Sequence, residues 1–130
     1  MKTFLLALIV VSAPAMAQSK DLQNAYLFEA DLKGADLQGA NLFHCQLGHA
    51  DLRNADLRNA NVAGAYLFKA DLRGADLRGA KFAQSLNGAE LKQTLLEGAR
   101  FDSSTMLPFS VDEAVRRGMI QVELVAVATK

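Results

Sequence analysis

The sequence has very little of several features on which protein function commonly depends. It contains a single cysteine, Cys45, so the chain cannot form an intramolecular disulfide even in an oxidising compartment. The 14 lysines and arginines balance the 14 aspartates and glutamates, so no strong net field attracts nucleic acid or an anionic membrane. The sequence also lacks a nucleophile elbow, a phosphate-binding glycine loop and a histidine placed to activate a nucleophile. We therefore expect no enzymatic activity and no cofactor.

Long hydrophobic runs are also missing. The apolar run near the N-terminus covers residues 4–11, and about eight residues cannot cross the hydrocarbon core of a membrane, which is about 30 Å thick. A lysine precedes this run, and Pro14 and an Ala-x-Ala motif ending at Ala17 follow it. This order is typical of a secretory signal peptide, here residues 1–17, with cleavage before Gln18. We expect an exported protein, periplasmic or secreted, without stable membrane insertion after cleavage.

What the sequence does contain is a phrase of five residues, Ala-Asp-Leu-x-x, repeated between residues 26 and 84. A period of five matches neither the 3.6 of a helix nor the 2 of a flat strand, so the repeat must be considered before secondary-structure propensity. One position in each unit is large and apolar: Leu22, Leu27, Leu32, Leu37, Leu42, Leu47, Leu52, Leu57, Val62, Leu67, Leu72, Leu77 and Phe82. The position two residues before the large one is small: Ala25, Ala30, Ala35, Ala40, Cys45, Ala50, Ala55, Ala60, Ala65, Ala70, Ala75 and Ala80.

A second period of twenty residues lies over the first, because residues 26–37 return almost unchanged as residues 66–77. Four units of five predict a coil with four sides, each of which turns one small and one large side chain inward. Successive coils would stack about 4.8 Å apart through strand-like hydrogen bonds. Residues that adopt positive φ easily stand where the corners should be: Gly34, Gly39, Asn54, Asn59, Gly64, Gly74 and Gly79.

This pattern resembles the pentapeptide-repeat family, whose signature is a run of A(D/N)LXX units. The resemblance extends over residues 20–103. It implies an all-β solenoid, namely a right-handed quadrilateral parallel β-helix, and the length of the repeat predicts about four coils. The family includes many members without known activity and a few that mimic DNA to protect gyrase, so the resemblance indicates a fold without fixing a function.

Charged residues should form columns on the outside of the coils. Asp31, Asp51 and Asp71 stand beside Lys33, Arg53 and Arg73, and Asp36, Asp56 and Asp76 stand beside Gln38, Arg58 and Arg78. These columns are either a solvated, salt-bridged surface or an ordered array that docks a partner. Mimicry of DNA requires carboxylates without nearby cations, whereas five of these six acids have a lysine or arginine two residues later. We do not expect nucleic acid as a partner.

Two groups of residues are candidates for a site. His44, Cys45 and His49 are of metal-ligating types, but the thiol should point inward and the imidazoles should leave different sides of the coil, so we expect no metal site. The second group is a possible partner-binding groove. Aromatic residues two coils apart, about 10 Å, would flank a glycine and leave a notch for a flat ring or an apolar side chain. The residues of this groove are Tyr26, Phe28, Gly48, His49, Tyr66 and Phe68.

The groove has an alternative, because the same aromatic side chains could lie flat along the wall or under the apolar segment 119–127. That segment either packs back on the solenoid or is a tail that awaits a partner. The repeat itself falters after Phe82, since Leu86 follows by four residues before the spacing of five resumes at Leu91, Leu96 and Phe101. This spacing predicts that one residue is dropped at a corner within residues 83–85, which would tighten the last coil.

The C-terminal part has a different character. Leu107-Pro108 ends the repeat, Ser110 and Glu113 form a capping box, and a helix over 111–117 should end at Gly118. We therefore divide the chain into a signal peptide (1–17), a β-helix (18–103) and a C-terminal cap (104–130) that covers one open end. The uncapped N-terminal end of the solenoid is a candidate surface for a homodimer.

Together these features favour a non-enzymatic binding or structural module of the bacterial cell envelope that acts through the faces of a β-helix. Its partner is expected to be a protein, which the sequence does not name. The alternative is a DNA-mimic regulator of a DNA-binding enzyme such as gyrase, which both the signal peptide and the balanced charge disfavour.

Overall fold

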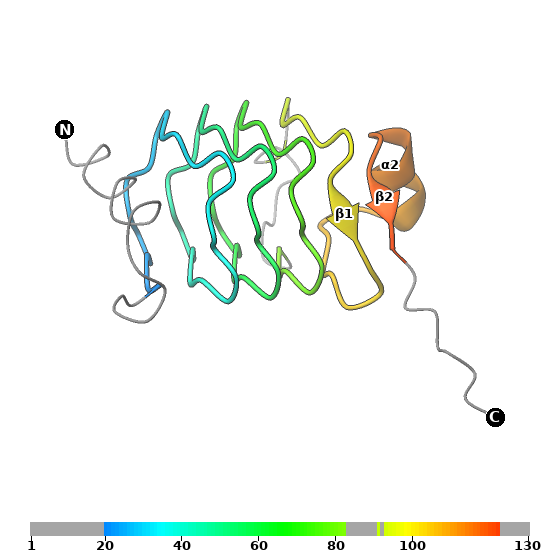
Figure 1. Cartoon of the computed structure of the whole chain (residues 1–130), viewed down its shortest axis with the longest axis horizontal. Coiled ribbons are helices and arrows are strands. Elements are labelled where there is room, and N and C mark those ends of the chain that lie inside the picture. The colour runs from blue at the N-terminus through cyan, green and yellow to red at the C-terminus, as the bar shows by residue number, and fades with distance from the viewer. Residues whose placement is uncertain (1–19, 83–90, 92, 123–130) are drawn as a thin grey trace.

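The chain winds into a solenoid around one continuous core (Figure 1). The structure is a computed structural model that describes residues 20–82, 91 and 93–122. Parallel bridges join residues twenty apart on all four sides, for example Asp21 to Asn41, Tyr26 to Gln46, Asp31 to Asp51 and Asp36 to Asp56. This register holds without interruption as far as Lys81, which pairs with Asn61. The solenoid with coils of twenty residues that the sequence predicts is therefore confirmed.

Each unit of five residues turns a corner in the same way. In the unit of Leu32, the N–H of Ala35 donates to the carbonyl of Leu32 at 3.0 Å and closes a four-residue turn. Gly34, the third residue of this turn, has a φ of +68°, as in a type II turn. The carboxylate of Asp31 accepts a bond from the N–H of Lys33 at 3.3 Å. The aspartate before each leucine therefore satisfies a turn N–H, a role that the repeat pattern did not suggest to us.

The corners bear out the expectation for glycine and asparagine. All seven residues assigned to corners have φ between +59° and +74°: Gly34, Gly39, Asn54, Asn59, Gly64, Gly74 and Gly79. Six further non-glycine residues share this conformation: Asn24, Glu29, His44, His49, Lys69 and Gln93. Three of them, Glu29, Lys69 and Gln93, belong to residue types that seldom adopt it, so only their place in the coil could have revealed them.

The core consists of the two inward columns. Every large residue from Leu22 to Phe82 is buried, and every small residue from Ala30 to Ala80 is buried as well, while Ala25 in the first coil is only partly buried. Cys45 takes the place of an alanine, as expected, and its thiol donates to the carbonyl of Leu22 at 2.8 Å. Thr94, in a later coil, makes the same kind of bond, because its hydroxyl donates to the carbonyl of Leu67 at 2.7 Å.

The predicted loss of one residue after Phe82 is wrong. Asp71 pairs with Leu95 and Asp76 with Arg100, so these partners are 24 residues apart and the coil is four residues longer than the others. Leu96 therefore follows Leu72, one side earlier than the spacing from Leu86 implies. The reason is that a spacing of five residues is the same on every side of a coil, so the spacing alone does not show on which side a residue lies. Only the pairing with the previous coil determines this. Leu86 itself lies outside the described residues.

At the end of this coil and after it, the chain forms its regular elements (Figure 1). Strand β1 is Arg100–Phe101 and pairs in parallel with strand β2, Ile120–Gln121, while helix α2, Val111–Arg116, joins them. The hydroxyl of Ser110 accepts a bond from the N–H of Glu113 at 3.2 Å and caps α2. At the other end, Met119 donates to Ala114 and Gly118 to Val115, which is the pair of bonds of a Schellman motif. The glycine has a φ of +83°, as this motif requires.

The start of the apolar segment 119–127 continues the ladder of the solenoid. The N–H of Ile120 donates to the carbonyl of Ala99, and the N–H of Val122 donates to the carbonyl of Phe101. Met119 is buried against the core, whereas Ile120 is half exposed. This part of the segment therefore packs on the last coil, and the rest, from residue 123 on, lies outside the described residues.

Candidate functional site

The six residues of the predicted groove lie together on one side of the solenoid, which we call the aromatic wall: Tyr26, Phe28, Gly48, His49, Tyr66 and Phe68. Bridges from Tyr26 to Gln46 and from Gln46 to Tyr66 set their register across three coils. The rings within one coil lie side by side, with centroids 6.1 Å apart both for Tyr26 and Phe28 and for Tyr66 and Phe68. Tyr26 is 53% exposed and Tyr66 is 37% exposed, so the wall presents aromatic surface to solvent.

The open notch expected at Gly48 is not present. A Cβ atom at this position would lie 2.9 Å from Cε2 of Phe28 and 3.0 Å from Cε1 of Tyr66, so both rings lean into the space that the glycine leaves. The imidazole of His49 packs beside them, 5.3 Å from the ring of Phe28 and 6.1 Å from that of Phe68. The physical reason is that exposed rings bury apolar area by closing over a residue without a side chain. The site is a filled aromatic surface.

Polar groups lie along one edge of the aromatic wall, at the corner positions of three successive coils. These residues are Glu29, Lys69 and, between them, His49 of the wall itself. The ammonium group of Lys69 lies 5.4 Å from the centre of the Phe68 ring, within the range of a cation–π contact. The described part of the segment 119–127 does not cover the wall, because β2 pairs with β1 on the side that carries Asp36, Asp56 and Asp76. The wall can therefore contact a partner through rings and through groups of both charge signs.

The next two sides along the chain carry the predicted charge columns, and there the structure forms close ion pairs within repeat units. The guanidinium of Arg58 binds the carboxylate of Asp56 at both ends, with Nε to Oδ1 at 2.9 Å and Nη2 to Oδ2 at 2.7 Å. The same arrangement joins Arg53 to Asp51, Arg73 to Asp71 and Arg78 to Asp76. The arginines also reach the next coil, since Nε of Arg58 lies 3.9 Å from Oδ2 of Asp76.

These pairs shift the pKa values of their members. A hydrogen bond from the arginine two residues later lowers the pKa of each of four carboxyl groups below its ordinary value: Asp51, Asp56, Asp71 and Asp76. The acids therefore stay ionised at neutral pH, and each negative charge is matched by a positive charge within its own repeat unit. These four carboxylates are therefore suited neither to donate a proton near neutral pH nor to form an unmatched row of phosphate-like charges.

His44, Cys45 and His49, which were considered as metal ligands, have different surroundings. The thiol of Cys45 is buried, and burial raises its pKa to about 11. The imidazole of His44 stacks on the ring of Phe43 with centroids 3.9 Å apart, while His49 belongs to the aromatic wall. Within the described ranges there is no group of three or more His, Cys, Asp or Glu residues that could hold a metal ion.

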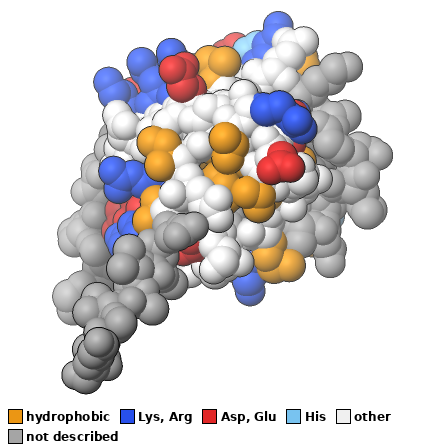
Figure 2. Space-filling model, turned by 90° about the vertical axis from the view of Figure 1, so that its right-hand side faces the viewer, with side chains coloured by type: hydrophobic (Ala, Val, Ile, Leu, Met, Phe, Trp, Pro, Cys, Tyr) orange, Lys and Arg blue, Asp and Glu red, His pale blue; other side chains and the backbone are white. Residues whose placement is uncertain are grey.

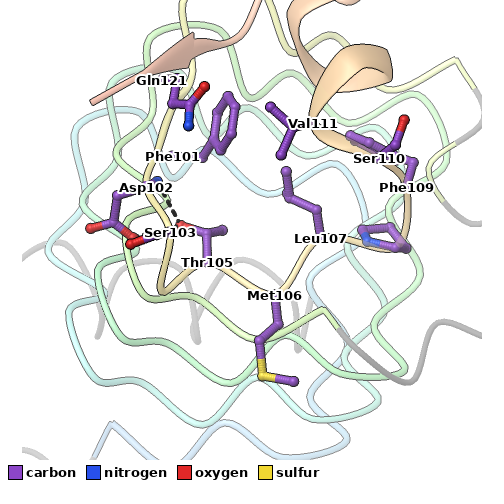
Figure 3. Close-up of a pocket in the computed structure, with 11 residues that line it drawn as sticks. Phe101, Asp102, Ser103, Thr105, Met106, Leu107, Phe109, Ser110, Val111 and Gln121 are labelled. Carbon is purple, nitrogen blue, oxygen red and sulfur yellow. Dashed lines mark hydrogen bonds between the residues drawn. The ribbon is translucent and has the colours of Figure 1, made fainter. Parts of the chain in front are cut away.

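A hollow that sequence reasoning missed lies at the C-terminal end of the solenoid. Its volume is about 840 Å³, and Figure 3 shows Phe101, Leu107 and Val111 pointing toward one another across it. Figure 2, which faces this end, shows several hydrophobic side chains at the surface, where Met106, Val111, Val115 and Ile120 are exposed. The one acid of the lining, Asp102, accepts bonds from Ser104 and Thr105, so it is engaged in a turn.

The sequence matches the family model described as pentapeptide repeats, with eight copies over residues 17–42 and 45–84. The matched segments of 26 and 40 residues make up 66 of 130 residues, just over half of the chain. The chain therefore belongs to the pentapeptide-repeat family. Membership implies a right-handed β-helical solenoid, in agreement with the parallel bridges at intervals of twenty residues. Proteins of this family are generally structural or binding modules.

Solved structures of this family resemble the chain. HetL from the cyanobacterium Nostoc sp. strain PCC 7120, a protein involved in heterocyst differentiation regulation, is 34% identical over 61% of this chain and 33% of its own, with a TM-score of 0.47. A second Nostoc protein is 32% identical over 79% of this chain and 85% of its own, with a TM-score of 0.37. A protein from the Arabidopsis thaliana thylakoid lumen is 30% identical over 82% of this chain and 72% of its own, with a TM-score of 0.32.

The chain thus spans about a third of the length of HetL. A comparison with curated proteins finds no match. In the part of the chain that the structure describes, no helix is both long enough and apolar enough to pass through a bilayer.

Proposed function

We propose that this protein is a non-enzymatic binding module of the bacterial cell envelope that recognises a partner protein through the aromatic wall. The observation that carries the proposal is the exposure of aromatic rings on one side of the solenoid while the charged sides are internally neutralised. Tyr26 is 53% exposed and Tyr66 is 37% exposed, and Lys69 and His49 border them. Aromatic residues such as tyrosine are enriched at the centres of protein interfaces, because the ring buries apolar surface while the hydroxyl forms hydrogen bonds.

The proposal includes the division of the chain that the sequence suggests. Residues 1–17 would direct export and be removed, residues 18–103 would form a β-helix of about four coils, and residues 104–130 would close its C-terminal end. Helix α2 and strand β2 support a capping role, because β2 pairs with the last coil and Ala114 of α2 is buried in the core. A covered end protects the solenoid from association through its edge.

The ion pairs support this function over the DNA-mimic alternative. A mimic must present carboxylates that a DNA-binding enzyme can take for phosphates, whereas the carboxylates of Asp51, Asp56, Asp71 and Asp76 are each bound by a guanidinium of their own repeat unit. Breaking such a pair to free the acid would cost the partner binding energy. Export would also remove the protein from a cytosolic enzyme.

Substitution of Gly48 by phenylalanine tests the aromatic wall. The new side chain must push the rings of Phe28 and Tyr66 aside, since a Cβ alone would lie 3.0 Å or less from both. A photo-reactive residue at the exposed position 66 would first capture the partner from envelope fractions, and the affinity of that partner would then be measured with Gly48→Phe. We expect a loss of affinity of at least about tenfold, because hot-spot contacts contribute about 2 kcal/mol or more.

The matched control is Arg73→Ala, which alters an exposed residue on the charged side two coils from the N-terminal end. It should leave affinity unchanged. If Gly48→Phe remains folded, as judged by circular dichroism, and binds the partner with the affinity of the unchanged protein, the aromatic wall is not the binding site.

A further inference from the structure

We propose that the N-terminal end of the solenoid is a dimer interface, in which the first coil of the mature chain pairs edge to edge with the first coil of a second copy. The proposal rests on the proposed export, because cleavage after Ala17 would leave only Gln18 and Ser19 before the described coils. Among the described residues, nothing lies beyond the first coil on this side of the molecule (Figure 1).

The first coil presents a row of main-chain groups at this end. Inside the solenoid, each side bonds to the coil before it: the N–H of Gln46 donates to the carbonyl of Ala25, and the carbonyl of Gln46 accepts from the N–H of Leu27. The equivalent groups of Tyr26 and Asp31 in the first coil point toward the N-terminal end. A row of this kind is a template for pairing with another chain. Any protein segment that pairs with it must follow the turn of a coil, and a second copy of the same coil does so.

A two-fold axis is the operation that brings the two edges together. Both copies have the same hand and the same rise per coil, so the distance between two facing edges stays constant as they wind around the solenoid. The described chain enters the first coil between the sides 36–38 and 21–23, so the edges can meet on three sides. On the fourth side the ammonium group of Lys20 already bonds the carboxylate of Asp36 at 3.0 Å and the carbonyl of Gln38 at 3.1 Å.

With the axis through the middle of the side 26–28, this side faces its own copy in antiparallel orientation. Tyr26 then lies opposite Phe28 of the second copy. The two neighbouring sides face each other, which places Lys33 opposite Asp21 of the second copy and Gln23 opposite Asp31. Aromatic pairs and pairs of opposite charge are the favourable cross-strand combinations, and this arrangement sets no like charges against each other.

An axis through the side 21–23 is less favourable. It would set the side 26–28 against the side 36–38 of the second copy, where the edges do not meet, so only the side 21–23 could pair with its own copy. The winding of the first coil therefore selects the axis through residues 26–28, which lets three sides meet. The contact is confined to the edge of one coil, so we expect a reversible monomer–dimer equilibrium.

The test uses the processed protein purified from exporting cells, whose N-terminus is first established by intact mass. Sedimentation over a concentration series at low salt should show a monomer–dimer equilibrium. Lys33→Glu should weaken dimerisation by at least about tenfold, because it turns both facing pairs with Asp21 into repulsions. Adding Asp21→Lys should restore much of the loss. The matched control is Gln38→Glu, the equivalent position on the side that makes no contact, and it should leave dimerisation unchanged.

The possible results separate this inference from the proposed function. A chain that begins at Gln18 and sediments as a monomer at all concentrations would overturn the dimer and leave the envelope function standing. A dimer that Lys33→Glu does not weaken would overturn this interface. A chain that retains residues 1–17 after expression would overturn the proposed export and the inference with it. If the double charge variant fails to fold, Tyr26→Cys combined with Phe28→Cys decides instead, since oxidation should link two copies and an unlinked monomer would overturn the pairing.

Discussion

Ala55 and Arg58 lie three residues apart but have opposite surroundings. Ala55 is 1% exposed and faces the core, whereas Arg58 lies on the outer surface and pairs with Asp56. Ala55→Leu should lower the free energy of unfolding by about 1–3 kcal/mol or more, because the packed column has no room for three further carbon atoms. Arg58→Ala should lower it by about 0.5 kcal/mol, since exposed pairs contribute little. Urea unfolding measures both, and equal midpoints would contradict the assignment of the inward positions.

The thiol of Cys45 should be inert in the folded protein. It is buried, it donates to the carbonyl of Leu22, and burial raises its pKa to about 11. Since the thiolate is the reactive form, alkylation at pH 8 should be slow in the native protein and complete in urea. Ser103→Cys introduces a thiol at an exposed position as the control, and we expect it to react at once. Rapid native labelling of the unchanged protein would place Cys45 outside the core.

At the scale of the elements, the ion pairs within the repeat units make stability depend on pH. The pKa values of Asp51, Asp56, Asp71 and Asp76 are lowered, chiefly by hydrogen bonds from the arginines two residues later. Their carboxylate forms are therefore favoured by folding. This contribution is complete above the unfolded value of 3.8 and is lost as the pH falls through the lowered folded values.

We therefore expect the melting temperature to change little between pH 7 and pH 5 on account of these groups, and to fall below about pH 4. Asp56→Asn is the informative variant, because an amide oxygen can still accept the bond from the N–H of Arg58 while the charge is gone. Its melting temperature should be lower at pH 7 and should fall less at low pH. Parallel acid curves for the two proteins would show that the pairs do not stabilise the fold.

At the scale of the whole molecule, the prediction that matters most concerns the N-terminus. We expect export to remove residues 1–17, because the short apolar run and the Ala-x-Ala motif before Gln18 fit a signal peptidase site. Intact-mass measurement of the protein from the periplasm or the medium should give a chain that begins at Gln18. Ala17→Phe should block this cleavage, since the site requires a small residue. A full-length chain recovered from the cytosol would remove the envelope function and restore the DNA mimic as the leading hypothesis.

The two ends of the solenoid differ in a way that follows from the sequence. At the C-terminal end, Ser110, Gly118 and the apolar residues after it form α2 and β2, which pair with the last coil. At the N-terminal end the repeat begins without an equivalent sequence after the predicted cleavage site. If export removes residues 1–17 as proposed, the solenoid would have one covered and one open end, and it could form a closed dimer without continuing into a fibre through those ends.

The amino-acid sequence alone is enough to establish the inward columns, the coil of twenty residues, the corner positions of glycine and asparagine and the burial of Cys45. It is enough because each of these features depends on spacing along the chain, and the spacing is repeated many times. The coil after Phe82 is different, since Leu96 lies beside Leu72 only because of the pairing between Asp71 and Leu95. A local spacing of five is satisfied on any side of the coil, so register depends on contacts between distant residues.

The candidate site also has some features that the sequence determines and others that only the tertiary structure decides. The period of twenty is sufficient to place Tyr26, Phe28, His49, Tyr66 and Phe68 on one wall, because stacking fixes which residues share a side. It does not indicate that Phe28 and Tyr66 close over Gly48, or that each repeated aspartate accepts a bond from its own turn. Those facts depend on rotamers and on the direction of single N–H groups. They are settled only when the coils pack together, because there each ring and each donor must find apolar contact or an acceptor.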